Sequence, residues 1–181
     1  AGDTLDVFVC HFPSRSGGAK ESEPYRLYVA HILRTEVDSI MNIRSHPQAI
    51  IMGDFNDYPT NQSILKILKA EAPPVKTNDL ASTTDSANAS TVTPSSLKLY
   101  HLLARKAKSK NFGSYKFRGE WGLLDHLIVS GTLLNQSNHF FTSEEKANVC
   151  LLPFLLKDDE KYGDKEPFRT YKAVSYTHLR A

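Results

Sequence analysis

Three segments near the amino terminus predict a strand, a helix and a second strand, in that order. Residues 4–12 are rich in β-branched and aromatic side chains, which favour an extended conformation. In residues 24–44 apolar side chains recur every three or four positions, the spacing of an amphipathic helix, and Pro24 suits its first turn. Residues 49–52 are a short continuous apolar run, typical of a central strand, which Gly53 ends. This order predicts a layered α/β (α+β) domain in which helices cover a sheet.

Beyond residue 60 the short elements continue. Residues 61–70 have the spacing of a short helix, and residues 97–108 that of a second amphipathic helix with a basic outer side. Residues 77–96 are mostly Ser, Thr, Asn and Asp, so we expect a polar surface loop inside one domain, because too few apolar side chains are present to offset the ordering entropy. Further strands are expected at residues 115–118, 123–129, 139–142 and 147–152, and a polar turn at 157–165.

Length and composition set outer limits. The chain has 181 residues, 40% of them hydrophobic, which suits one domain or a piece of a larger one. No apolar run approaches the roughly 20 residues that span a bilayer, so no transmembrane segment is expected. The first residues carry neither an initiator Met nor a basic signal-peptide region. The localisation therefore stays open, cytoplasmic or exported.

The two cysteines say little about the compartment. Cys10 and Cys150 both lie among apolar neighbours in the sequence. Unpaired cysteine is usually a small core residue, so we expect two buried free thiols, with a single disulfide between them as the alternative.

Charge is unevenly distributed along the chain. Lys and Arg number 22 and Asp and Glu 20, so the net charge is +2. Residues 97–120, however, hold seven basic side chains and a single acidic one, Glu120. A stretch of this kind can contact phosphate groups, nucleic acid included, or can be the solvated face of a helix.

Polar side chains follow the first two predicted strands. His11 is available as an acid, a base or a hydrogen-bond donor near neutral pH, although a lone strand-end histidine is more often structural. Asp54, Asn56 and Asp57 come in one tight turn after Gly53, and Asp54 and Asn56 share a face if the segment is extended. A carboxylate with an amide suits a hydrated divalent cation, or an attacking water and a phosphoryl oxygen. The alternative is an Asx turn that closes the strand.

A third segment places a carboxylate inside an apolar run. Asp125 interrupts the strand predicted at 123–129, where a carboxylate costs stability unless it is paired or hydrogen-bonded. We therefore expect Asp125 to orient another group or to support a metal. His126 alternates to the opposite face and is interpreted as structural.

Together these segments resemble the endonuclease/exonuclease/phosphatase superfamily, metal-dependent phosphoesterases with a DNase-I-like fold. The most specific element is Gly-Asp-Phe-Asn-Asp at 53–57, and His-Phe-x-Ser-Arg at 11–15 and Leu-Asp-His-Leu-Ile-Val-Ser at 124–130 support it in the right order. Residues 167–171 also look like a late segment of bacterial members. The resemblance implies a four-layer α/β/β/α sandwich, of which this chain supplies mainly the second half.

The same resemblance implies roles for individual residues. Asp54 would orient or deprotonate the attacking water, and Asn56 would hydrogen-bond the water or the phosphate close to the metal. His11 would stabilise negative charge on the phosphoryl oxygens, Asp125 would orient a catalytic histidine or support the metal, and Arg15 is a candidate for phosphate contact. The implied cofactor is Mg²⁺ or Mn²⁺, with Asp54, Asn56 and Asp125 at the metal.

The resemblance also implies parts that have no counterpart here. The family supplies an Asn and a metal-binding Glu earlier in the chain and closes with Ser-Asp-His. Residues 1–173 are therefore interpreted as a partial domain and residues 174–181 as a non-native tail. His178 follows Thr177 instead of an Asp, so it receives no catalytic role. We expect these 181 residues alone to show little or no activity.

The implied function is metal-dependent hydrolysis of a phosphate ester by direct water attack. The ester could be a phosphodiester or a phosphomonoester, so DNA, RNA, lipids, nucleotides and sugar phosphates all remain candidate substrates, and the oligomeric state is open. The alternative is a non-catalytic binding or scaffolding member of the same fold. Convergence of His11, Asp54, Asn56 and Asp125 at one edge of a sheet is the arrangement that the family interpretation requires.

Overall fold

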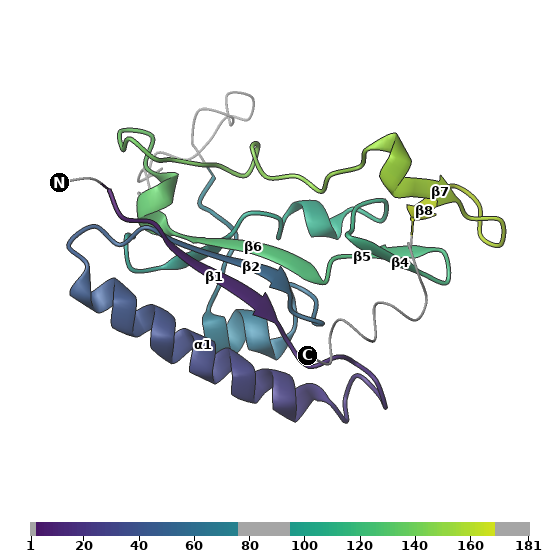
Figure 1. The fold of residues 1–181 in the computed structure, drawn as a ribbon, viewed down its shortest axis with the longest axis horizontal. Coiled ribbons are helices and arrows are strands. Elements are labelled where there is room, and N and C mark those ends of the chain that lie inside the picture. Colours follow the sequence, from purple (N-terminus) through teal and green to yellow (C-terminus); the bar gives the residue numbers. More distant parts are fainter. Residues whose placement is uncertain (1–2, 76–94, 169–181) are drawn as a thin grey trace, which may run out of the picture.

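A computed structural model of the chain describes residues 3–75 and 95–168 (Figure 1). The strands are β1 (Asp6–His11), β2 (Ala49–Asp54), β3 (Leu99–His101), β4 (Tyr115–Phe117), β5 (Glu120–Gly122), β6 (Asp125–Ser130), β7 (Leu156–Asp158) and β8 (Lys165–Pro167). The helices are α1 (Glu23–Ile43) and the short segments η1 (Ser63–Leu68), η3 (Lys106–Lys108), η4 (Gly131–Leu134) and η5 (Pro153–Leu155).

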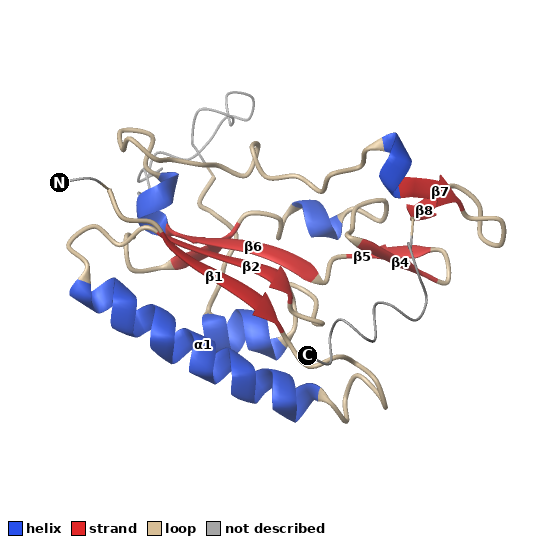
Figure 2. Cartoon of the chain, viewed as in Figure 1, coloured by secondary structure: helices blue, strands red, loops and turns tan. Residues whose placement is uncertain are grey.

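One four-stranded sheet organises these elements. Its strand order is β1-β2-β6-β3, with β1 parallel to β2 and β6 antiparallel to both of its neighbours. Helix α1 makes the connection between β1 and β2 that a parallel pair requires. Two small hairpins, β4–β5 and β7–β8, lie beyond the end of this sheet (Figure 2). A mixed α/β architecture follows from this arrangement.

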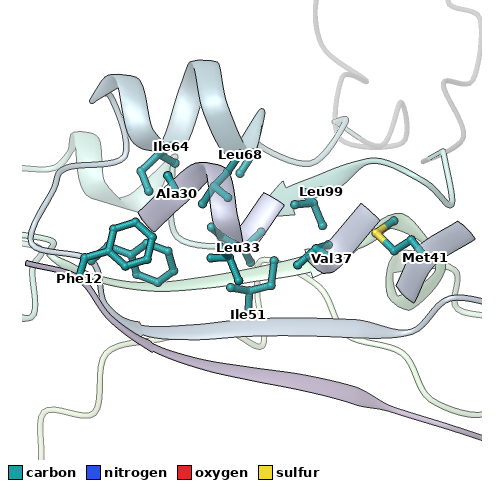
Figure 3. Packing of buried hydrophobic residues seen from close by; sticks show 12 residues of the cluster. Phe12, Ala30, Leu33, Val37, Met41, Ile51, Ile64, Leu68 and Leu99 are labelled. Atoms are coloured by element: carbon teal, nitrogen blue, oxygen red, sulfur yellow. The ribbon is translucent and has the colours of Figure 1, made fainter. Parts of the chain in front are cut away.

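The main core lies between one face of the sheet and α1 (Figure 3). The helix presents Ala30, Leu33, Val37 and Met41 toward the sheet, at the spacing of three and four that the sequence predicts. The short helix η1 packs beside α1 and closes the same core. The buried side chains of this cluster are Phe12, Ala30, Leu33, Val37, Met41, Ile51, Phe55, Ile64, Leu68, Ala70, Leu99 and Ile128.

The other face of the sheet is covered only in part. A second cluster packs against its β6 side, and its buried members are Leu102, Leu103, Leu123, Val129, Leu133 and Ala147. Over β1 and β2 the same face is open: Val7, Val9 and Met52 are 48%, 78% and 38% exposed. We call these three residues the open sheet face.

Several predicted elements are confirmed. The helix predicted at 24–44 is α1 (Glu23–Ile43), with Pro24 in its first turn. Residues 61–70 contain η1, and the first two apolar segments form β1 and β2. The strands expected at 115–118 and 123–129 correspond to β4 and β6, and the polar turn at 157–165 joins β7 to β8. No helix in the described residues has the length and apolar character needed to cross a membrane.

The amphipathic helix predicted over residues 97–108 is wrong. Leu99, Tyr100 and His101 instead form β3, which pairs antiparallel with β6, and only the three residues of η3 are helical. All three β3 side chains are buried. A short apolar run buried on both faces cannot be distinguished from a helix by spacing alone, so pairing with β6 decided the outcome.

The strands predicted at residues 139–142 and 147–152 are also wrong. Both segments are irregular, and neither pairs with a strand in the described part of the chain. Burial of Cys150 is wrong as well, because this thiol is exposed together with Leu151 and Leu152, while Cys10 is half-buried. Both thiols are free, so the alternative disulfide is not formed. Residues 77–94 of the expected polar loop and the tail at 174–181 lie outside the described residues.

Candidate functional site

Three strand ends bring together three of the predicted site residues. In the parallel pair β1–β2 His11 lies opposite Asp54, and in the antiparallel pair β2–β6 Asp54 lies opposite Asp125. Residues in register on neighbouring strands project from the same face of a sheet. The imidazole and the two carboxylates therefore form a row across the end of the sheet at which β1 and β2 finish. Figure 2 shows where these strands end.

The row is accessible to solvent. The His11 Nε2 atom lies 3.8 Å from Asp54 Oδ2, and the two side chains are 43% and 39% exposed. At this separation the two groups attract each other when the imidazole is protonated, but they do not share a direct hydrogen bond. Both can therefore contact a molecule that arrives from solvent.

Gly53 lets β1 and β2 meet closely just before the row. Its φ angle is 129°, in the region that side chains disfavour, and a Cβ atom there would lie 2.0 Å from the Cys10 carbonyl oxygen. Only glycine fits at this position.

The turn after β2 is closed by hydrogen bonds. The Asn56 backbone N–H donates to Asp54 Oδ1 at 2.8 Å, the Asx turn that was the alternative interpretation, and Asn56 has a left-handed φ of 50°. The extended alternation assumed for Asp54 and Asn56 therefore ends at Asp54. The Asn56 Nδ2 atom donates to the Phe12 carbonyl at 3.0 Å, which ties the turn to the end of β1 and leaves the side-chain oxygen available to a ligand.

Burial and a like charge make Asp54 more basic than an ordinary aspartate. Partial burial raises the pKa of its carboxyl, the negative charge of Asp125 adds to the rise, and the hydrogen bond from Asn56 opposes it. A cation placed between the two carboxylates would relieve their mutual repulsion.

The predicted environment of Asp125 is wrong, although its place in the row is not. Asp125 is the first residue of β6 and is exposed, so it pays no burial cost, and its backbone N–H is bonded to Ser114 Oγ at 3.2 Å. The strand starts two residues later than predicted, which moves the carboxylate from the strand interior to its end. His126 points to the opposite face and is buried, as expected.

Arg15 lies over an aromatic ring from the neighbouring loop. Its guanidinium carbon is 4.9 Å from the centroid of the Tyr58 ring, a cation–π contact. The buried Arg15 Nε has no hydrogen-bond partner among the described residues. The loops after β1 and β2 therefore hold a guanidinium with an unused donor.

The basic stretch at 97–120 does not form one free surface. Arg105 is paired with Glu144, Lys106 donates to the Ala147 carbonyl at 2.5 Å, and Lys116 is buried 3.1 Å from Asp159. These three cations are occupied by partners within the chain, so the structure weakens the argument for a continuous phosphate-binding patch here.

Sequence reasoning gave no role to Asp57 and did not single out Arg26. Asp57 is buried next to Asn56, and its Oδ1 atom lies 2.8 Å from Nε of the equally buried Arg26 of α1. The Asp57 side of this pair was visible in the motif at 53–57. Its partner, far away in sequence, has no local signal.

The oxygen ligands at the end of the sheet suit a divalent cation that is bound by few protein groups. Among the described residues no group of three or more His, Cys, Asp or Glu side chains is arranged as a metal site. Mg²⁺, however, is usually held by one or two carboxylates together with waters and substrate phosphates. Asp54 and Asp125 in register, with the Asn56 oxygen nearby, fit that requirement.

Comparison with known proteins identifies one family. A model of the endonuclease/exonuclease/phosphatase family matches residues 1–83 and 76–179, which together cover most of the chain. No curated protein matches the chain significantly.

Proposed function

Because this chain belongs to the endonuclease/exonuclease/phosphatase family, we propose that it carries part of the catalytic site of a divalent-metal-dependent hydrolase of phosphate esters. The observation that carries the proposal is the row of His11, Asp54 and Asp125 across three hydrogen-bonded strands, with Asn56 in the adjoining turn. Family membership alone indicates phosphoesterase-type chemistry; this row supplies the groups that such chemistry needs.

Asp54 is the proposed general base. A carboxylate that is partly desolvated and faces a second carboxylate holds a proton more readily than a free aspartate, which suits it to accept a proton from the attacking water. The water oxygen then bonds to phosphorus, the ester oxygen leaves, and that oxygen takes up a proton. Asn56 holds the water or a phosphoryl oxygen through its amide, which the bond to Phe12 keeps in place.

Two hydrogen-bond donors, on β1 and in the loop that follows it, would stabilise the charge that develops. His11 is 3.8 Å from Asp54 and exposed, so it can donate to a phosphoryl oxygen bound there. Arg15 offers a guanidinium that stacks on Tyr58, and its terminal nitrogens would bind a further phosphate oxygen.

Asp54, Asn56 and Asp125 are the residues that would hold Mg²⁺ or Mn²⁺. When bound, such a cation supplies a Lewis acid that polarises the phosphoryl group. Asp125 would contribute by keeping its carboxylate beside Asp54 at the end of β6.

The open sheet face supports a four-layer sandwich in the complete protein. Val7, Val9 and Met52 would be costly to leave in water, whereas the opposite face of the same strands packs against α1. A second sheet packed on this face would produce the α/β/β/α order, with the present residues as one half.

Manganese binding tests the site without relying on turnover. In the ¹⁵N-labelled chain, Mn²⁺ should broaden the amide signals of residues 11, 54–56 and 125, and Mg²⁺ should compete with it. Asp54→Ala should abolish the local broadening. Asp38→Ala, which removes a carboxylate from α1 that pairs only with Arg34 among the described residues, is the matched control and should leave it unchanged.

Hydrolysis of p-nitrophenyl phosphate and bis(p-nitrophenyl) phosphate, each with Mg²⁺ or with EDTA, separates catalysis from binding. Magnesium-dependent turnover lost in Asp54→Ala would establish the hydrolase and overturn the expectation that these 181 residues are inactive alone. Local Mn²⁺ binding without turnover fits a partial site or the non-catalytic alternative. Broadening that is centred elsewhere, or unchanged by Asp54→Ala, would contradict the proposal.

A further inference from the structure

A buried arginine connects α1 to two loops around the candidate site. Arg26 donates through one terminal nitrogen to Ser22 Oγ at 2.7 Å and through the other to the Ala19 carbonyl at 2.7 Å. Its Nε lies 2.8 Å from Asp57 Oδ1. The two terminal nitrogens thus donate to the loop after β1. The Nε atom forms an ion pair, without a hydrogen bond, to the turn after β2.

Asp57 is the centre of the network. Its second carboxylate oxygen accepts a hydrogen bond from Ser63 of η1 at 2.7 Å, and its carbonyl accepts one from His126 Nε2 at 2.8 Å. Asp57 directly follows Asn56, and His126 directly follows Asp125. The network therefore reaches the neighbours of two proposed site residues.

The hydrogen-bond network continues from His126 to His101 on β3. Its Nδ1 atom is hydrogen-bonded to His101 Nε2, and His101 Nδ1 accepts from the Leu103 backbone N–H at 3.1 Å. The donors and acceptors fit one pattern, with both imidazoles neutral and each carrying its proton on Nε2. Both rings are buried, so this pattern links β3 and β6 to the turn after β2.

Stability alone does not account for so many buried polar groups. Removing a guanidinium and a carboxylate from water is expensive, and well-packed apolar residues can often replace a buried ion pair at no loss. Buried hydrogen bonds and an ion pair that join separate segments, in contrast, restrict how those segments can move relative to one another. Here the partners lie in the loop after β1, the turn after β2 and the start of β6, the segments that carry the candidate site.

We propose that Arg26, Asp57 and His126 are positioning residues that hold the site segments after β1 and β2 and at the start of β6 in their relative geometry. The proposal rests on the proposed function, because it assigns the network to that same site. Two backbone bonds report on this geometry: Phe12 N–H donates to the Asp54 carbonyl at 2.8 Å, and Phe55 N–H donates to the Leu124 carbonyl at 2.9 Å.

The test compares two arginines on the same helix. Arg26→Lys keeps a positive charge near Asp57, but its compact ammonium cannot replace the planar guanidinium that spans the loop after β1 and the turn after β2. Arg34→Lys is the matched control, because Arg34 also bonds a carboxylate, Asp38, and a backbone carbonyl, that of Leu68, but contacts no segment of the site. Ser63→Ala is a milder variant that leaves one Asp57 oxygen without its donor, in case Arg26→Lys does not fold.

Hydrogen exchange is measured at the amides of Phe12, Phe55 and Asn56, with Ile51 and Ile128 in the sheet centre as references. Arg26→Lys and Ser63→Ala should accelerate exchange at the three reporters about tenfold relative to the references, and Arg34→Lys should not. In parallel, the Mn²⁺ dissociation constant should rise about tenfold in Arg26→Lys and stay near the wild-type value in Arg34→Lys.

Uniform acceleration at reporters and references alike would mean that the network only stabilises the fold, and would overturn the proposal. So would unchanged reporters in both network variants. A wild-type chain that binds no Mn²⁺ would instead remove the metal site of the proposed function. The exchange result would still decide whether the network positions these segments.

Discussion

At the scale of single residues, burial separates the two cysteines chemically. Partial burial raises the pKa of the Cys10 thiol from 9.0 to about 11, so its reactive thiolate is rare at neutral pH. Cys150 is exposed. We expect iodoacetamide at pH 8 to modify Cys150 first and Cys10 at least about tenfold more slowly, as mass spectrometry of a time course would record.

Cys150→Ser provides the control for this experiment. The remaining thiol should react slowly in the native chain and fast in denaturant, because unfolding removes the burial of Cys10. Rapid labelling of native Cys150→Ser would show that β1 opens easily and would contradict the environment of Cys10 described above.

Individual residues also show how much of the candidate site could be predicted from the sequence. His11 and Asp54 were predictable as neighbours, because parallel strands joined by a helix finish at the same end of a sheet. The paired roles of Arg26 and Asp57 were not, since the spacing of a helix predicts only that a residue faces the core, and a charged residue at such a position is normally assigned to the surface. Asp125 falls between these cases: its register with Asp54 needed the pairing of β2 with β6.

At the scale of elements, long-range pairing decided what local patterns could not. Helix α1 and strands β1 and β2 have periodic sequences long enough to be predicted, whereas β3 is three residues whose partner, β6, lies far along the chain. The segments at 139–142 and 147–152 have strand-like composition, but a strand also needs a free edge to pair with. Composition carries no information about that edge.

The junction of β3 and β6 should make the chain sensitive to mild acid. Burial lowers the pKa of His101 from 6.5 to about 3 and that of His126 to about 4. The unfolded chain therefore binds more protons than the folded chain once the pH falls below about 6.5, so stability is full above that pH and declines below it. Each histidine contributes a slope of about 1.4 kcal/mol per pH unit within this window.

Urea unfolding at pH 7.5, 6, 5 and 4.5 would measure this dependence. The slope of the wild-type chain should exceed that of His101→Asn, and His31→Gln on the exposed side of α1 should behave as wild type. Equal slopes for wild type and His101→Asn would mean that the buried pair accepts protons in the folded state, contrary to the hydrogen-bond pattern proposed for it.

At the scale of the whole molecule, one face of the sheet is packed against α1, whereas part of the other face is exposed to solvent. Val7, Val9 and Met52 form the open sheet face, and β1 is an edge strand with no pairing partner on its outer side among the described residues. Exposed apolar surface beside an unpaired edge promotes association. We expect the 181-residue chain to self-associate with rising concentration in sedimentation experiments.

Charged substitutions identify the surface responsible. Burying one Val or Met side chain is worth about 1.5–3 kcal/mol, so Val9→Lys or Met52→Lys should weaken association by about tenfold or more. Tyr28→Lys, on the equally exposed outer side of α1, is the matched control and should leave association unchanged. If Tyr28→Lys weakens association as much as Val9→Lys, association is not specific to the open sheet face. The proposal that a second sheet packs on that face then loses this support. If Val9→Lys alone gives a monomer, the face that a sandwich would bury is the face that drives association.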